Sequence, residues 1–201
     1  MDKKELEILL EKCSSYAGPR ADMEQYTTPT SLAAMIIYHA YLSGDIGGKR
    51  VYDLGCGTGI FAIGCALMGA KEVKGFDVDG EALAVAQENA EKMGVSSVTW
   101  VKADVKDISG KCDTVFQNPP FGVRRAKADR GFLDKALEVG SVVYTVHKAV
   151  TREFVSKYVE SRGGIITDVI DEDFVLPKSY DFHRMDRKKI RVSVYRVKRS
   201  D

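Results

Sequence analysis

The chain has 201 residues, of which 44% are hydrophobic and 29% are charged, and its formal net charge is +1. A chain of this size can bury a sizeable core in one domain without disulfide or metal staples. No apolar run is long enough to span a membrane, and the N-terminus starts with an amphipathic pattern in place of a signal peptide. We therefore expect a cytoplasmic protein.

The four cysteines are far apart in sequence and include no C-x-x-C pair, which argues against a zinc site and against a disulfide framework. They are Cys13, Cys56, Cys65 and Cys112. We expect no metal site, and we expect these thiols to be reduced and mostly buried.

Helix and strand patterns alternate along the chain. Helices are expected over residues 3–13, from Leu32 to Ala40 with Thr30 or Ser31 as N-cap, and over residues 60–67, 81–93, 132–139 and 151–161. Strands are expected over residues 50–54, 73–78, 98–101, 113–116, 142–146, 165–169 and 190–195. The alternation predicts one α/β domain over residues 1–201, with a mainly parallel sheet covered on both faces and ligands at the carboxyl ends of its strands.

A stiff polar loop follows the apolar run that ends at Phe116. It reads Asn118, Pro119, Pro120 and Phe121, and the two prolines fix their own φ angles and remove two backbone donors. Such a loop can hold the Asn118 side chain and nearby carbonyls in place, with the Phe121 ring as a flat surface beside them. The arrangement suits a planar group that carries an amine, and the alternative is a simple turn.

A strand, a glycine loop and a helix follow one another at residues 50–67, with Asp53 just ahead of Gly55, Gly57 and Gly59. Small residues let a ligand approach the backbone, and the helix N-terminus offers N–H groups. Dinucleotide enzymes usually show G-x-G-x-x-G, and a carboxylate beside the loop suits an ammonium group better than a pyrophosphate. The spacing favours S-adenosylmethionine over NAD; the alternative is a tight turn with a buried capping Asp53.

Two further acids follow predicted strands. Asp77 ends the second strand, where an acid can accept both ribose hydroxyls, and its neighbour Asp79 is expected to cap the next helix. Asp104 follows the third strand and is placed to reach an adenine amine, or else to act as a cap.

Taken in order, the motif DLGCGTG at residues 53–59, Asp77, Asp104 and the motif NPPF at residues 118–121 resemble the class I, S-adenosylmethionine-dependent N6-adenine methyltransferases. The motifs EQYTTP at residues 24–29 and YTVHK at residues 144–148, with the basic tail, are similar to the archaeal and eukaryotic family that methylates adenine in small-subunit ribosomal RNA. The chain carries no added target-recognition domain of the kind typical of DNA adenine methylases, which favours RNA as the substrate.

The resemblance implies a Rossmann-like sheet of seven strands, with an antiparallel last strand, and residues 1–48 as an N-terminal helical cap and cofactor lid. It implies that Asn118, Pro119, Pro120 and Phe121 are catalytic, and that the N6 amine of an unpaired adenosine receives the methyl group. The implied cofactor-binding residues are Gln25, Tyr26, Thr28, Asp53, Gly55, Cys56, Gly57, Gly59, Asp77, Val78, Asp104, Val105 and Asn118.

Basic residues cluster after the Asn-Pro-Pro loop and in the tail, where Arg184 to Arg199 hold eight Lys or Arg against one acid. We expect phosphate or substrate contacts from Arg124, Arg125, Lys127, His147, Lys148, Lys188, Lys189 and Arg191. The alternatives are solvated charged faces and, for His147, a structural role.

The segment Val98 to Val101 is expected at the edge of the sheet, where its Trp100 invites strand addition by a partner. Because eukaryotic relatives work with a small zinc-containing activator protein, the resemblance implies a similar partner; the alternative is a Trp100 buried under the chain's own helices. Two rival functions remain open: a protein glutamine N5-methyltransferase, and a non-catalytic RNA-binding or ribosome assembly factor on the same fold.

Overall fold

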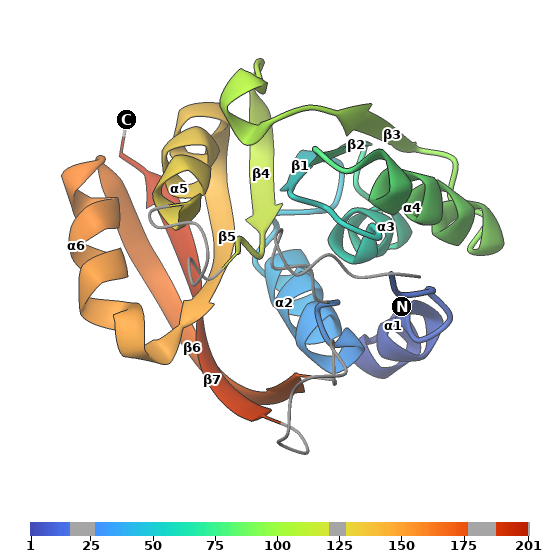
Figure 1. Ribbon diagram of the computed structural model, residues 1–201, viewed down its shortest axis with the longest axis horizontal. Helices are drawn as coiled ribbons and strands as arrows, with labels where there is room; N and C mark the ends of the chain where they lie inside the picture. Colours follow the sequence, from blue (N-terminus) through green and yellow to red (C-terminus); the bar gives the residue numbers. More distant parts are fainter. Residues whose placement is uncertain (17–26, 121–127, 177–187, 201) are drawn as a thin grey trace.

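Seven strands form one sheet in the order β3-β2-β1-β4-β5-β7-β6, with helices on both faces (Figure 1). The computed structural model describes residues 1–16, 27–120, 128–176 and 188–200. The strands are β1 (Arg50–Leu54), β2 (Glu72–Asp77), β3 (Val98–Lys102), β4 (Cys112–Gln117), β5 (Gly140–Lys148), β6 (Gly164–Leu176) and β7 (Lys188–Arg199). Neighbouring strands pair in parallel from β3 to β5, whereas β7 is antiparallel to both β5 and β6. The predicted mainly parallel sheet with an antiparallel last strand is confirmed.

Two hydrophobic clusters, one on each face, join the helices to the sheet. The described helices are α1 (Lys3–Leu10), α2 (Thr30–Leu42), α3 (Ile60–Leu67), α4 (Gly80–Lys92), α5 (Ala128–Val139) and α6 (Arg152–Ser161), with short 3-10 helices η2 (Val105–Asp107) and η3 (Ala149–Thr151). Leu10, Ile37 and Ile63 from α1, α2 and α3 are buried on one face, whereas Leu133 and Val155 from α5 and α6 are buried on the other.

Some boundaries differ from the sequence prediction. Neither Thr30 nor Ser31 is the N-cap of α2: the cap position is Pro29, without a side-chain hydrogen bond, and its carbonyl accepts the Ala33 N–H at 2.9 Å. The fixed φ of proline, here −55°, already leads the chain into the helix, so no side-chain cap is needed. The strand β6 extends far beyond residue 169, because β7 keeps pairing with it although acidic residues interrupt its apolar pattern.

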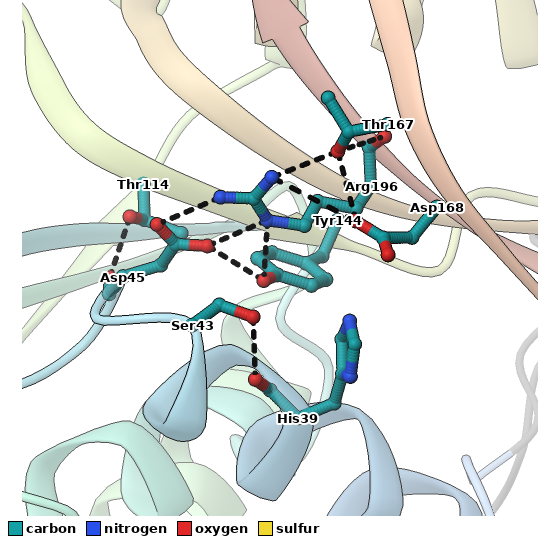
Figure 2. Close-up of polar contacts among 8 residues, drawn as sticks. All are labelled: His39, Ser43, Asp45, Thr114, Tyr144, Thr167, Asp168 and Arg196. Atoms are coloured by element: carbon teal, nitrogen blue, oxygen red, sulfur yellow. Dashed lines mark hydrogen bonds and ion pairs between the residues drawn. The ribbon is translucent and has the colours of Figure 1, made fainter.

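A buried ion pair fixes the reversed strand β7 against the rest of the sheet (Figure 2). Asp45, in the loop after α2, accepts the Nε–H of Arg196 at 2.8 Å and the hydroxyl of Tyr144 at 2.6 Å, and both charged residues are less than 10% exposed. Arg196 also donates from Nη1 to Thr167 on β6 at 2.8 Å. Because one guanidinium joins the loop, β5 and β6, this network defines where β7 lies.

The four thiols are free, and Cys56, Cys65 and Cys112 are buried, as the sequence predicted. Burial raises the pKa of each of these three thiols. Within the described residues, no group of His, Cys, Asp or Glu could hold a metal ion, and no helix is long and apolar enough to cross a membrane.

Candidate active site

The carboxyl ends of β1, β2 and β4 lie level with one another. The register pairs Leu54 with both Phe76 and Gln117, so the segments that follow these strands meet at one edge of the sheet. These segments hold the glycine loop, Asp77 and Asn118. The structure thereby brings together three groups that are up to 63 positions apart in the chain, from Gly55 to Asn118.

The glycine loop needs its glycines for backbone geometry. Gly55, Gly57 and Gly59 have φ angles of 68°, 53° and 89°, in the left-handed region that L side chains rarely adopt. The loop is tied to β2, because the N–H groups of Gly55 and Cys56 both donate to the Phe76 carbonyl, at 2.8 and 2.9 Å. Gly59 is the N-cap of α3.

Asp53 is the most buried acid of the site, with 1% of its surface exposed. Its Oδ2 accepts the Ala62 N–H at 3.0 Å, whereas its Oδ1 is buried without a hydrogen-bond partner. Burial raises the pKa of Asp53 to about 8, with a smaller contribution from the Asp77 charge, and the Ala62 hydrogen bond opposes the shift. A buried carboxylate oxygen that lacks a donor fits a cationic ammonium group.

Asp77 accepts two backbone hydrogen bonds, from Gly57 at 2.8 Å and from Asp79 at 2.9 Å. Burial raises the pKa of Asp77, and these two bonds oppose the shift. Asp79 caps α4 by accepting the Glu81 N–H at 3.0 Å, which confirms the predicted cap. The neighbouring Val78 is 43% exposed at the same edge.

Asp104 follows β3 and caps the 3-10 helix η2, where its Oδ1 accepts the Lys106 N–H at 3.1 Å. It also lies 3.8 Å from the Lys106 Nζ. The capping role considered from the sequence is therefore present. A contact of Asp104 or Val105 with an adenine amine stays a prediction.

Asn118 is half-buried at the end of β4, and its Nδ2 donates to the Thr28 Oγ1 at 3.0 Å. Thr28 precedes α2 and is 7% exposed. The segment predicted to close over the cofactor therefore contacts the predicted catalytic loop directly. The other residues predicted there, Gln25, Tyr26 and Phe121, lie outside the described residues.

A buried polar chain behind Asn118 was missed from the sequence. Gln117 is 0% exposed, and its Nε2 donates to the Thr145 Oγ1 at 3.0 Å. The Thr145 hydroxyl lies 2.8 Å from the His147 Nε2, and burial lowers the pKa of His147 to about 4. Because the ring is then neutral near pH 7, its Nε2 can accept the Thr145 proton. The sequence did contain one signal for this chain: the polar residues Thr145 and His147 are two positions apart on a strand, so their side chains lie on the same face of the sheet.

The structure describes only some of the residues predicted to contact RNA. Arg124, Arg125 and Lys127 lie outside the described residues, as do the side chains of Lys188 and Lys189. Lys148 is half-buried at the end of β5, and Arg191 is exposed, with its Nη2 3.6 Å from the Asp171 Oδ2. His147 is only 3% exposed, so we remove it from the set of RNA contacts. Its ring lies edge-on to the ring of Tyr195 on the neighbouring strand β7, with the two ring centroids 5.9 Å apart.

Two residues of the site gave no sequence signal. Tyr16, after α1, places its hydroxyl so close to Gly57 that a Cβ on Gly57 would collide with it. Asn89, on α4, is fully buried and donates from Nδ2 to the carbonyls of Ser14 and Thr58, both at 3.0 Å. A single tyrosine in a polar stretch, and a single asparagine on a helix, carry no periodic pattern.

Trp100 lies at the predicted edge of the sheet, but its ring points inward. A Cβ added at Gly59 or Gly75 would come within 2.6 Å of ring carbons of Trp100, so the ring packs beneath the glycine loop. Its Nε1 is buried without a hydrogen-bond partner. The alternative of a Trp100 packed under the chain's own elements therefore agrees with the structure.

These groups fit S-adenosylmethionine by their chemistry. The glycine loop leaves the backbone open to close approach, Asp53 offers a buried carboxyl oxygen without a hydrogen-bond partner for an ammonium group, and Asp77 lies beside the same loop. The fold and this site define a class I methyltransferase, for which S-adenosylmethionine is the methyl donor.

Comparison with known proteins agrees. The sequence model of one family, described as ribosomal protein L11 methyltransferase (PrmA), matches residues 26–119. An uncharacterised protein of Methanocaldococcus jannaschii is 41% identical over 98% of this chain and 94% of its own length. The rRNA N(6)-adenosine-methyltransferase Mettl5 of Drosophila melanogaster is 35% identical over 96% of this chain and 94% of its own length. A crystal structure from Pyrococcus horikoshii, described as a candidate RNA methyltransferase, has a TM-score of 0.93 at 38% identity and covers 100% of this chain and 99% of that chain. The chain belongs to the family of the rRNA N6-adenosine methyltransferases.

Proposed function

We propose that this protein methylates the N6 amine of an unpaired adenosine in small-subunit ribosomal RNA. The observation that carries the proposal is the position of Asn118: it lies at the end of β4, level with the glycine loop after β1, and is held there by Thr28. An amide so placed can bind an exocyclic amine next to a cofactor on the glycine loop.

S-adenosylmethionine supplies an activated methyl group on a sulfonium. The chain's own task is to position the acceptor, because the lone pair of an adenine amine is delocalised into its ring. The Asn118 amide nitrogen donates to Thr28, and the Asn118 side-chain oxygen is the first proposed acceptor of an N–H from the base. The Pro119 carbonyl is the second proposed acceptor, and Phe121 is proposed to stack on the base. Such preorganised contacts contribute on the order of a few kcal/mol each.

No protein base is required before the transfer, since the amine loses its proton only as its charge develops. Because the base edge must enter the site, the adenosine has to be unpaired or flipped out of a helix. Loops and bulges of RNA meet that condition at little cost. Phosphate contacts are proposed for Arg124, Arg125, Lys127, Lys148, Lys188, Lys189 and Arg191.

Three further assignments belong to the same proposal. Residues 1–48 act as a cap over the cofactor, which the Thr28 contact with Asn118 supports. The location is cytoplasmic, which the free thiols support. A small zinc-containing activator pairs with the edge strand β3, and the position of β3 at the edge of the sheet supports this pairing. The Trp100 ring faces inward, so the partner would contact the backbone of β3 and its exposed side chains. Full activity and solubility of the isolated chain would contradict an obligate activator.

The function is tested with radiolabelled S-adenosylmethionine and three acceptors: ribosomal small subunits, naked ribosomal RNA and a release factor. After digestion, label should appear in N6-methyladenosine. The control is Asn118→Ala, which should abolish transfer and leave cofactor affinity nearly unchanged. Label in protein would favour glutamine methylation, and absence of label in all three would favour a non-catalytic factor.

A further inference from the structure

The segment that follows α1 is bound across the cofactor site by one buried asparagine. The Ser14 N–H donates to the Asn89 Oδ1 at 2.8 Å, and the Asn89 Nδ2 donates back to the Ser14 carbonyl at 3.0 Å. The same Nδ2 donates to the Thr58 carbonyl in the glycine loop at 3.0 Å. Lys92 adds a hydrogen bond from Nζ to the Ser14 Oγ at 3.0 Å. Asn89 therefore fixes the segment and the glycine loop relative to each other.

This fixation places Tyr16 at the centre of the site. Its hydroxyl contacts Gly57 from the side where a Cβ would stand. Burial and the nearby carboxylates, foremost Asp77, raise the pKa of the Tyr16 phenol. The phenol is therefore protonated near neutral pH, where its hydroxyl can donate a hydrogen bond.

The glycine loop has few donors left for a ligand. The N–H groups of Gly55 and Cys56 donate to the Phe76 carbonyl, and the Gly59 N–H donates to the Cys56 carbonyl at 2.8 Å. The Gly57 N–H is bound to Asp77 at 2.8 Å. The side chains that surround this loop are acidic, which suits the ammonium and the ribose of the cofactor. The carboxylate of the cofactor, in contrast, needs hydrogen-bond donors. The four N–H groups named above are already bonded within the protein and do not serve it.

We propose that the Tyr16 hydroxyl binds the carboxylate of S-adenosylmethionine, which makes Tyr16 a cofactor-specificity residue. Asn89 is then a positioning residue that acts through the Ser14 backbone. The inference rests on the proposed cofactor site, but it concerns binding alone and is measured without RNA.

The test compares wild type with Tyr16→Phe, each titrated with S-adenosylmethionine and with decarboxylated S-adenosylmethionine. The second compound keeps the sulfonium, the amine and the adenosine and lacks only the carboxylate. Affinities come from calorimetry and from the fluorescence of Trp100, the single tryptophan, whose ring packs against Gly59. Tyr41→Phe is the matched control, because Tyr41 is 43% exposed on α2. Melting temperatures establish that each variant is folded.

Tyr16→Phe should lower the affinity for S-adenosylmethionine by about tenfold, as expected for loss of a hydrogen bond to a charged group. The affinity of Tyr16→Phe for the decarboxylated compound should lie within about twofold of the wild-type affinity for that compound. Tyr41→Phe should match wild type for both compounds. An equal loss of affinity for both compounds would overturn the proposal, because it would assign Tyr16 a packing role. Unchanged or tighter binding of S-adenosylmethionine would overturn it as well. If these affinities are found but the wild-type protein does not methylate RNA, the proposed function is contradicted and the role of Tyr16 in cofactor binding stands.

Discussion

Asn118 and Thr28 are 90 positions apart in the chain, yet the Asn118 Nδ2 donates to the Thr28 Oγ1 at 3.0 Å. The bond joins the loop after β4 to the segment that leads into α2. Thr28 is 7% exposed, so water competes little for this contact. The orientation of the Asn118 amide therefore depends on a residue from the N-terminal part of the chain.

Thr28→Val removes the hydroxyl and keeps the shape of the side chain. We predict that kcat falls by about tenfold, since a misoriented Asn118 amide loses one preorganised contact with the acceptor amine. The affinity for S-adenosylmethionine should change less than kcat. Steady-state kinetics and calorimetry measure the two effects. Thr28→Ser retains the hydroxyl and should restore most of kcat; failure of this rescue would show that the methyl group and not the hydrogen bond matters.

The polar chain from Gln117 to His147 should be important for stability. Thr145→Val leaves the Gln117 Nε2 and the His147 Nε2 buried without a partner, which costs about 1–3 kcal/mol per group. Urea unfolding measures the loss, with the exposed Thr99→Val on β3 as the matched control. The double variant Gln117→Leu with Thr145→Val should lose less than the sum of the single losses. Additive losses would mean that the two side chains are not coupled.

Asp53 gives the stability of the free protein a pH dependence. Its folded pKa of about 8 lies above the usual value of 3.8, so the folded state favours the protonated acid. This contribution is fully present below about pH 4 and is lost as the pH rises toward 8. Asp53→Asn removes it, so the free energy of unfolding of the variant relative to wild type should increase between pH 5 and pH 9. Urea titrations across these pH values test this, and a constant difference would contradict the raised pKa.

The Asp45 and Arg196 pair predicts a large loss of stability on removal of one partner. Asp45→Ala removes the closer of two acids that pair with the buried guanidinium: the Asp168 Oδ2 remains 3.7 Å from the Arg196 Nη1, but the Asp168 side chain is 42% exposed. We expect a cost of about 3 kcal/mol, at the low end of the range for breaking a buried ion pair. Glu153→Ala is the control, because it breaks an exposed ion pair with Lys157 on α6 and should cost less than about 1 kcal/mol. Equal losses in thermal unfolding of the two variants would contradict the importance of the buried pair.

Local sequence signals determined the sheet, the glycine loop and the Asn-Pro-Pro turn. Alternating strand and helix patterns carry the fold class, because burial on both faces imposes them on every segment. The glycines at 55, 57 and 59 and the acid at 53 stand within seven consecutive residues. They could be recognised from the sequence because the acid and the backbone geometry of the loop arise from one contiguous stretch.

Only the tertiary structure decided which distant side chains meet. Tyr16 reaches Gly57 because Asn89 binds the Ser14 backbone, and no periodic pattern encodes that contact. His147 stands near the carboxyl end of β5, yet it is only 3% exposed, and its ring lies edge-on to that of Tyr195 on β7, the antiparallel strand that pairs with β5. Burial of a residue at a strand end depends on which segment packs over it, and that segment is chosen by the whole fold, not by the neighbouring residues.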